Sequence, residues 1–318
     1  MDERRAVVAS QPGVALAALE LGPSASAVDR VLAAVLAAVA TSPGVLFGPL
    51  QILMAGGGLG SFAIDGRVRQ PGRGAPRPRG FLERDEIPEA AWVAAPALPA
   101  AVAASVALVR TTTLSRIAAP AIELAKDRSE MRTKLLRAIG RRGAAALGER
   151  AFAEELVVAF GRTAGGLLTA EDLVSPDTEA VAAASRVPWL GDAPSSDATV
   201  HIVAAGDARG RFAVACYEDA GESGIELPVL DVVVPRLSEP VRRGEVRTRP
   251  GTPRPAAAPI GVHMDAGTVY AVLGRTGKAQ RDDVDELLRR TTEVGWAVPA
   301  GVVGVRRTRQ GAKGLGSA

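Results

Sequence analysis

Residues 31–64 contain no charged side chain, and this stretch is the strongest single constraint on how the chain folds. An uncharged run of such length either crosses a membrane or lies within a protein core. Proline or glycine residues interrupt it at 42–44, 48–49 and 56–58, so it cannot form one continuous helix. Prolines also interrupt the second uncharged run, residues 90–109. We therefore expect both runs to supply buried core elements and predict no membrane span.

The composition describes a globular chain with an unusual core. The 318 residues are 47% hydrophobic but only 3% aromatic, so Ala, Val and Leu must fill the interior of one large domain or two ordinary ones. A single cysteine, Cys216, excludes an internal disulfide and a multi-thiolate metal site. Only His201 and His263 could provide imidazole ligands, which argues against a histidine-rich zinc site. We expect no bound metal.

The charge pattern bears on partners and localisation. The formal net charge is +3, and nearly all the positive charge comes from arginine. Arginines cluster at 67–84, 242–254 and 306–309 in glycine- and proline-rich stretches, which lack the series of aromatic residues on which bases stack. We interpret these clusters as solvated loops and predict no nucleic-acid partner. Residues 2–5 are charged and lead into no clean apolar segment with a cleavage site, so we expect a cytoplasmic protein.

Hydrophobic periodicity changes along the chain. The first half is mainly helical, and Ser26 with Asp29 three residues later is typical of a capping box. The second half favours hairpins, followed by one amphipathic helix and a mobile tail over 305–318. This order indicates antiparallel sheet layered against helices. The expected strands are 6–10, 61–64, 199–205, 211–218, 227–234, 260–264 and 268–273, and the expected helices are 13–21, 26–40, 99–109, 115–126, 129–139, 149–160, one beginning at Thr169, and 282–292.

The segment Thr199-Val200-His201 stands where linker composition ends and a strand begins. Thr199 and His201 are two residues apart, so on a strand they lie on the same face. A threonine becomes a nucleophile when a base stands beside its hydroxyl, and a chain-terminal threonine supplies its own amine as that base. This chemistry requires cleavage between Ala198 and Thr199. The alternative is that both residues are ordinary packed strand residues.

Several segments together resemble the gamma-glutamyltranspeptidase family, also called gamma-glutamyltransferase or glutathione hydrolase. Residues 165–173, Gly-Gly-Leu-Leu-Thr-Ala-Glu-Asp-Leu, are similar to the family's G-G-x-L-T-x-E-D-L segment. Thr199-Val200-His201 falls where the family has T-T-H, whose first threonine is the nucleophile freed by autoproteolysis. The other similar segments, all in family order, are Ala6–Pro12, Ala27–Asp29, Gly56–Phe62 and Ala118–Ala125.

The resemblance implies a compact α+β fold of the N-terminal-nucleophile hydrolase type, an αββα sandwich. Residues 1–198 would correspond to the large subunit and 199–318 to the small subunit, two fragments that associate after cleavage. Thr199 would attack a small-molecule γ-glutamyl or related amide, and the acyl group would pass to water or to an amino-acid acceptor. The family uses no metal or organic cofactor.

The resemblance also implies roles for further residues. Gly277 is the counterpart of a glycine whose backbone N–H stabilises the tetrahedral oxyanion. Arg73 would bind the substrate's α-carboxylate, and Glu218 would contact its amine. His201 would support the surroundings of the nucleophile, with a packed strand histidine as the alternative.

The chain departs from the family pattern at several places. Val200 replaces the second threonine of T-T-H, residues 255–259 lack the serine pair that helps to hold substrate, and Lys278 replaces a glycine. The region between 174 and 198 is much shortened, and the family's C-terminal P-R-x-H segment is absent. These departures favour a second hypothesis, a catalytically inactive descendant that acts as a binding or assembly protein.

Residues 274–278 also resemble a phosphate-binding loop, because Gly-Arg-Thr-Gly-Lys follows a predicted strand and precedes a predicted helix. The motif G-x-x-x-x-G-K-[ST] requires glycine at position 272 and serine or threonine at 279. The chain has Val272 and Ala279 there, which argues against nucleotide binding.

Overall fold

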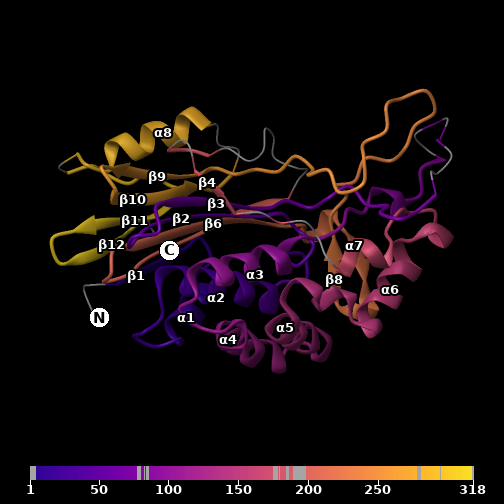
Figure 1. The fold of residues 1–318 in the computed structure, drawn as a ribbon, viewed down its shortest axis with the longest axis horizontal. Coiled ribbons are helices and arrows are strands. Elements are labelled where there is room, and N and C mark those ends of the chain that lie inside the picture. The colour runs from indigo at the N-terminus through magenta and orange to yellow at the C-terminus, as the bar shows by residue number, and fades with distance from the viewer. Residues whose placement is uncertain are drawn as a thin grey trace.

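The computed structural model arranges helices and two sheets in layers (Figure 1). It describes residues 5–76, 80–81, 83, 86–174, 178, 180–183, 186–188, 198–277, 281–293 and 295–316. Helices cover one face of a six-stranded sheet, a four-stranded sheet packs on its other face, and one more helix covers the outer face of the second sheet. The predicted combination of helices and antiparallel sheet is thereby confirmed.

The six-stranded sheet joins distant parts of the chain in the order β1-β5-β6-β2-β3-β4. Every neighbouring pair in it is antiparallel. The hairpin predicted from the strands 199–205 and 211–218 is confirmed, and in its tight turn the Gly210 N–H donates to the Asp207 carbonyl. The strands are β1 (Ala6–Ala9), β2 (Leu50–Gly56), β3 (Ser61–Gly66), β4 (Ala180–Ala182), β5 (Thr199–Gly206) and β6 (Arg211–Asp219).

Helix α2 (Ala27–Thr41) lies against the six-stranded sheet and is buried on all sides from Ala27 to Ala40. The predicted capping box is present: the Ser26 hydroxyl accepts from the Asp29 N–H, and the Asp29 carboxylate accepts from the Ser26 N–H at 2.7 Å. The uncharged run thus becomes core, with α2 followed by β2 and β3. No helix within the described residues is long and apolar enough to cross a membrane.

Helices α1, α3, α4 and α5 contact α2, while α6 and α7 lie farther along, toward the β8 end of the molecule (Figure 1). Helix α4 contains Pro120 and continues past it, and Thr113 caps its start by accepting from the Arg116 N–H. These helices are α1 (Pro12–Leu19), α3 (Leu98–Val109), α4 (Leu114–Lys126), α5 (Glu130–Arg142), α6 (Arg150–Phe160) and α7 (Ala170–Val174).

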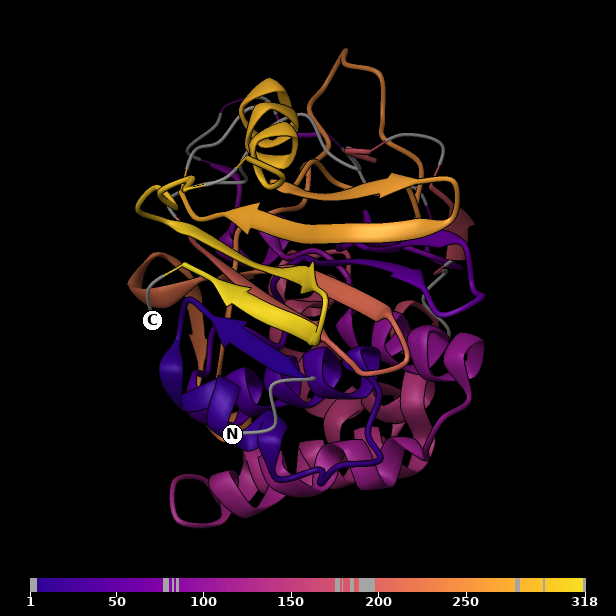
Figure 2. The ribbon, with the colours of Figure 1, turned by 90° about the vertical axis from the view of Figure 1, so that its left-hand side faces the viewer.

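The four-stranded sheet has the order β12-β11-β10-β9, and the predicted hairpin of β9 (Ile260–Asp265) and β10 (Thr268–Arg275) is confirmed. Its inner face shares a core of aliphatic side chains with β2, β5 and β6. Helix α8 (Arg281–Arg290) covers the outer face, where Val284, Leu287 and Leu288 pack on β10 and β11. Figure 2 shows α8 above this sheet.

Two expectations from the sequence need correction, and one strand was not expected. The tail is ordered where described, because β11 (Val302–Thr308) and β12 (Gly311–Leu315) pair as a hairpin. The expected strand 227–234 is divided into β7 (Ile225–Leu227) and β8 (Val232–Val234), since Pro228 begins a short turn that ends at Asp231 with φ of 51°. Strand β2 has no polar alternation because both of its faces are buried, and a fully buried strand carries no period-two signal.

We expect Asp29→Ala to lower the free energy of unfolding by about 2–3 kcal/mol, because it removes a buried charged acceptor and a helix cap. Asp29 is 2% exposed and accepts from Ser26 and from the Thr111 hydroxyl. The control Glu123→Ala breaks only an exposed ion pair with Lys126 on α4 and should cost less than about 0.5 kcal/mol. Urea denaturation measures both variants, and equal losses would contradict this account of α2.

Candidate active site

Thr199 is the first residue of β5 and is exposed. It pairs with Asp219, the last residue of β6, so it stands at one end of the six-stranded sheet. The next residue, Val200, is 6% exposed and packs in the core between the two sheets. Side chains alternate along a strand, so Thr199 lies on the opposite face, the one that the helices cover. Residues 189–197, most of the expected linker, lie outside the described part of the chain.

His201 is the next residue on the face of Thr199, and it contacts the start of α1. Its Nδ1 lies 3.3 Å from the Ser10 hydroxyl, and its Nε2 lies 3.3 Å from the Gln11 amide nitrogen. The Tyr217 hydroxyl donates to the other end of the Gln11 amide at 2.8 Å. Burial lowers the pKa of His201, and the charge of Asp219 opposes this only in part. His201 is therefore a neutral member of a side-chain network at neutral pH.

Asp219 fixes the end of β6 beside Thr199. One carboxylate oxygen accepts from the Ser42 hydroxyl at 2.5 Å, directly after the end of α2. The other accepts from the Gly221 N–H at 3.0 Å. The C-terminal end of α2 is therefore tied to the strand end that pairs with Thr199.

Glu218 lies on the opposite face, between the two sheets. It is 2% exposed, and its carboxylate accepts from the Ala257 N–H at 3.1 Å. The Ala257 carbonyl accepts from the Gln51 amide at 3.0 Å and from the Cys216 thiol at 3.6 Å. Burial, together with the charge of Glu218, raises the pKa of Cys216, so the thiol stays protonated. Glu218 is thus joined to the segment 255–259.

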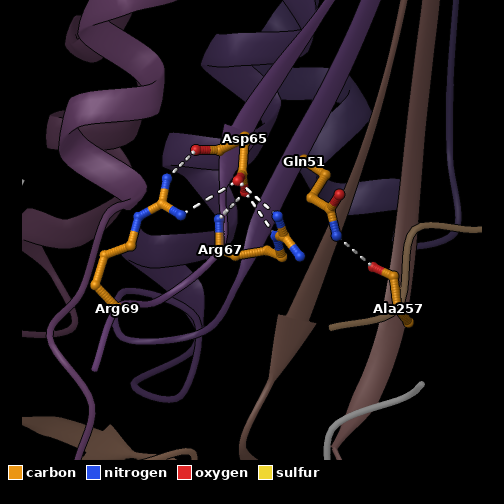
Figure 3. A network of polar contacts seen from close by, with 5 residues as sticks. All are labelled: Gln51, Asp65, Arg67, Arg69 and Ala257. Carbon is orange, nitrogen blue, oxygen red and sulfur yellow. Dashed lines mark hydrogen bonds and ion pairs between the residues drawn. The ribbon is translucent and has the colours of Figure 1, made fainter. Parts of the chain in front are cut away.

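Gln51 lies between the Cys216–Ala257 contact and a charged cluster formed by Asp65, Arg67 and Arg69. Cross-strand pairing places Cys216, Gln51 and Asp65 side by side on β6, β2 and β3. Figure 3 shows Gln51 reaching Ala257, and both arginines reaching the carboxylate of Asp65. The Gln51 side-chain oxygen is buried and has no hydrogen-bond partner among the described residues. The face between the sheets thus carries a band of polar groups near the Thr199 end.

Asp65 holds two guanidinium groups at the end of β3. Arg67 donates to both carboxylate oxygens at 2.9 Å, and Arg69 donates to one of them at 3.2 Å. Burial by itself raises the pKa of Asp65, but the hydrogen bonds from Arg67 and the charge of Arg69 outweigh it, so the pKa lies below its ordinary value. The carboxylate is ionised throughout the neutral range.

Gly277 stands at the same end of the molecule as Thr199. It follows β10 with φ of +79°, a conformation that suits glycine. Three residues earlier, a Cβ on Gly274 would lie 3.0 Å from the Ile202 side chain on β5. From this contact the chain continues forward from Gly274 to Gly277, and β5 leads back from Ile202 to Thr199. Lys278 lies outside the described residues.

Arg73 lies apart from these groups, in a turn near α7. Its N–H donates to Asp172 at 3.2 Å, and its carbonyl accepts from the Thr169 hydroxyl. Its guanidinium lies against Gly251, where a Cβ would be 2.9 Å from Nη2. The row of paired residues Cys216, Gln51 and Asp65 instead leads to Arg67 and Arg69, which were expected in a solvated loop although Arg69 is buried. The signal for this cluster was a spacing of two residues, which places Asp65, Arg67 and Arg69 on one face of an extended segment.

No group of three or more His, Cys, Asp or Glu side chains that could hold a metal ion occurs within the described ranges. The groups around Thr199 include the Asp219 carboxylate of the paired strand and the neutral imidazole network of His201.

The fold is shared with solved structures. Cephalosporin acylase from Bacillus halodurans superposes with a TM-score of 0.65 at 13% identity, over 99% of this chain and 94% of that chain. The structure described as LmbA2991HD superposes with a TM-score of 0.55, also at 13% identity, over 98% and 96% of the two chains. No protein-family model and no curated protein matches the chain. The chain therefore shares its fold with this acylase structure. A sequence identity of 13% supports a common fold and nothing more specific.

We expect the stability of the protein to fall as the pH drops from 7.5 to 5.5, with His201 as a source of this loss. The folded state lowers the imidazole pKa below its unfolded value of about 6.5, so the unfolded state binds the proton first. The loss begins near the unfolded pKa and is complete below the folded one. His201→Gln should flatten this dependence, and proton NMR titration of the imidazole should give a folded pKa below 6.5; a higher value would contradict the prediction.

We expect Asp65→Ala to destabilise the protein by about 3 kcal/mol, because it removes a mostly buried carboxylate that accepts from both Arg67 and Arg69. The matched control is Asp285→Ala, which removes a more exposed carboxylate from an ion pair with Arg289 on α8. Guanidinium denaturation compares the two. A loss for Asp65→Ala no larger than that for the control would show that the cluster contributes little to stability.

Proposed function

We propose that the protein is an amidohydrolase or acyltransferase of the N-terminal-nucleophile type, with Thr199 as the nucleophile. The position of Thr199 carries the proposal. It is an exposed threonine at the first position of a strand that lies between β1 and β6, within a chain that has the fold of an acylase. Cleavage of the Ala198–Thr199 bond would leave a threonine whose α-amine stands beside its own hydroxyl.

The reaction follows from that arrangement. The freed amine accepts the hydroxyl proton while the Thr199 Oγ attacks the amide carbonyl, and the amide's amine leaves with a proton to give an acyl ester on Thr199. Water or an amine acceptor then attacks the ester and regenerates the hydroxyl. We propose the Gly277 N–H as a donor to the developing oxyanion, since Gly277 and Thr199 lie at the same end of the two sheets.

The resemblance to gamma-glutamyltranspeptidases supports a γ-glutamyl amide as the acyl donor. The resemblance gives Arg73 the α-carboxylate of this donor, although Arg73 lies apart from Thr199 in a turn near α7. In this proposal Glu218 contacts the α-amine, and His201 supports the nucleophile through its network with Ser10 and Gln11. The likeness to cephalosporin acylase makes a cephalosporin side-chain amide the alternative donor.

A second candidate is a non-catalytic binding or assembly protein with the same fold. The burial of Glu218 favours this second candidate, because the residue is 2% exposed and its carboxylate already accepts from the Ala257 N–H. A substrate amine would have to displace the segment 255–259 to reach it. The departures from the family pattern at Val200 and Lys278 point the same way.

Autoproteolysis separates the two candidates. We expect purified protein to give two fragments by intact mass, residues 1–198 and 199–318, with a new N-terminus that reads Thr-Val-His. Thr199→Ala should leave one intact chain, because the attacking hydroxyl is lost, whereas Thr199→Ser should still cleave. The control Thr268→Ala alters another threonine at the start of a strand and should leave cleavage unchanged.

A wild-type chain that stays intact would refute the N-terminal-nucleophile proposal and favour the binding protein. If cleavage occurs, a γ-glutamyl anilide with and without a dipeptide acceptor distinguishes hydrolysis from transfer. A cephalosporin amide in the same assay tests the alternative donor. If the cleaved protein hydrolyses neither the γ-glutamyl anilide nor the cephalosporin amide, both acyl donors are excluded from the proposal.

A further inference from the structure

Four arginines surround a pocket of about 370 Å³ at the end of the molecule opposite Thr199. Arg209 and Arg211 come from the turn between β5 and β6 and the start of β6, while Arg110 and Arg116 come from the end of α3 and the first turns of α4. Strand β5 spans about 26 Å, so the pocket and Thr199 are separated by the full length of the sheet. Figure 2 faces this end of the molecule.

Within the described part of the chain, no acidic residue lines the pocket. Asp207, at the turn, is 5% exposed, and its carboxylate accepts from the backbone N–H groups of Ala27, Arg209 and Arg211. Its lone pairs are therefore directed at backbone donors. The four guanidinium groups leave a concentration of positive charge that calls for a ligand of at least two negative charges.

Arg211 provides donors that point to a ligand. Its Nε and Nη1 are buried and have no hydrogen-bond partner among the described residues. Its side chain packs on Gly57, where a Cβ would lie 2.3 Å from Cγ and 2.9 Å from Nε. The missing side chain at Gly57 leaves the space that Arg211 occupies. Buried guanidinium donors without a partner are costly unless an acceptor binds them.

Arg110 is held in a conformation that arginine rarely adopts. It ends α3 with φ of 51° and ψ of 35°, in the left-handed region where glycine is the usual residue. Such a conformation is unfavourable for a residue with a Cβ. A strained residue at a helix end is expected where its side chain serves a purpose beyond stability.

We propose that this pocket binds a phosphate group, either as free phosphate or as part of a small phosphorylated molecule. Guanidinium groups bind phosphate oxygens through paired N–H donors, and the dianion supplies the charge that four arginines require. The hydroxyls of Ser24 and Thr112 line the same pocket and can donate to further oxygens. The site is separate from the chemistry proposed for Thr199 and does not depend on it.

The test is titration of the full chain with inorganic phosphate by calorimetry, at constant ionic strength set with chloride. We expect saturable binding, and Arg116→Ala and Arg209→Ala should each weaken it about tenfold by removing a charged donor. The control Arg137→Ala removes an exposed arginine from α5 and should leave the affinity unchanged. No saturable binding, or equal weakening in the control, would overturn the proposal.

Arg110→Gly separates a ligand-binding role from a structural one. Glycine relieves the left-handed strain, so the melting temperature without phosphate should stay the same or rise. Phosphate affinity should nevertheless fall about tenfold, and phosphate should raise the melting temperature of the variant less than that of the wild type. Unchanged affinity in this variant would exclude Arg110 from the site.

Further ligands identify the source of the phosphate. Tighter binding of a sugar phosphate or nucleoside monophosphate than of inorganic phosphate supports a phosphorylated metabolite, and equal binding supports the free ion. Succinate at the same concentration should bind at least tenfold more weakly. A single-stranded oligonucleotide that binds more tightly than every small phosphate, with a steep salt dependence, would overturn the small-molecule proposal.

Discussion

The burial of α2 against the six-stranded sheet is the constraint on which the rest of the structure depends. This helix of 15 residues, uncharged after Arg30, spans about 22 Å, close to the length of the β5–β6 hairpin that it supports. Both ends of the hairpin are bound to it. At one end the Asp207 carboxylate accepts from the Ala27 N–H, and at the other Asp219 accepts from the Ser42 hydroxyl. The helix therefore fixes the positions of the hairpin's turn and of its open end together.

Those two ends carry the two proposed sites. Thr199 lies at the open end beside Asp219, and the arginine pocket lies at the turn beside Asp207. Each carboxylate is used for structure, accepting from backbone or hydroxyl groups, which leaves the nearby cations and hydroxyls for ligands. A rigid helix between them means that both sites are positioned by the same core, although their ligands need have nothing in common.

Much of the fold was predictable because local signals agreed with tertiary demands. The capping box at Ser26 and Asp29 and the two hairpins were all predicted from short patterns and are present. Strand β2 was missed because burial on both faces removes the alternation that marks a strand. The β11–β12 hairpin was missed because its glycines and arginines are typical of loops, while cross-strand pairing with β10 decides its structure.

The site was less predictable than the fold. The exposure of Thr199 follows from its place at the start of a strand, but the partners of Glu218 and Gln51 come from residue 257, far along the chain. In the sequence, Arg67 and Arg69 stand at the start of an arginine-rich stretch interpreted as a loop, and Asp65 directly follows the expected strand 61–64. Only pairing of β3 with β2 brings their carboxylate and guanidinium groups beside Gln51. Their spacing of two residues indicates a common face, but local spacing does not indicate which strand pairs with that face.

The two faces of β5 and β6 impose different conditions on a substrate. On the helix side, Thr199 is exposed and can be reached directly, while on the inner side Glu218 and Gln51 are covered by the segment 255–259. An acyl donor that touches Thr199 alone needs no rearrangement. A substrate that is also recognised by Glu218 must replace the hydrogen bonds that Ala257 makes with Glu218 and Gln51. It must therefore carry one hydrogen-bond donor and one hydrogen-bond acceptor, so that neither buried side chain is left unpaired. An amino-acid acyl group meets that condition, and a plain aliphatic one does not.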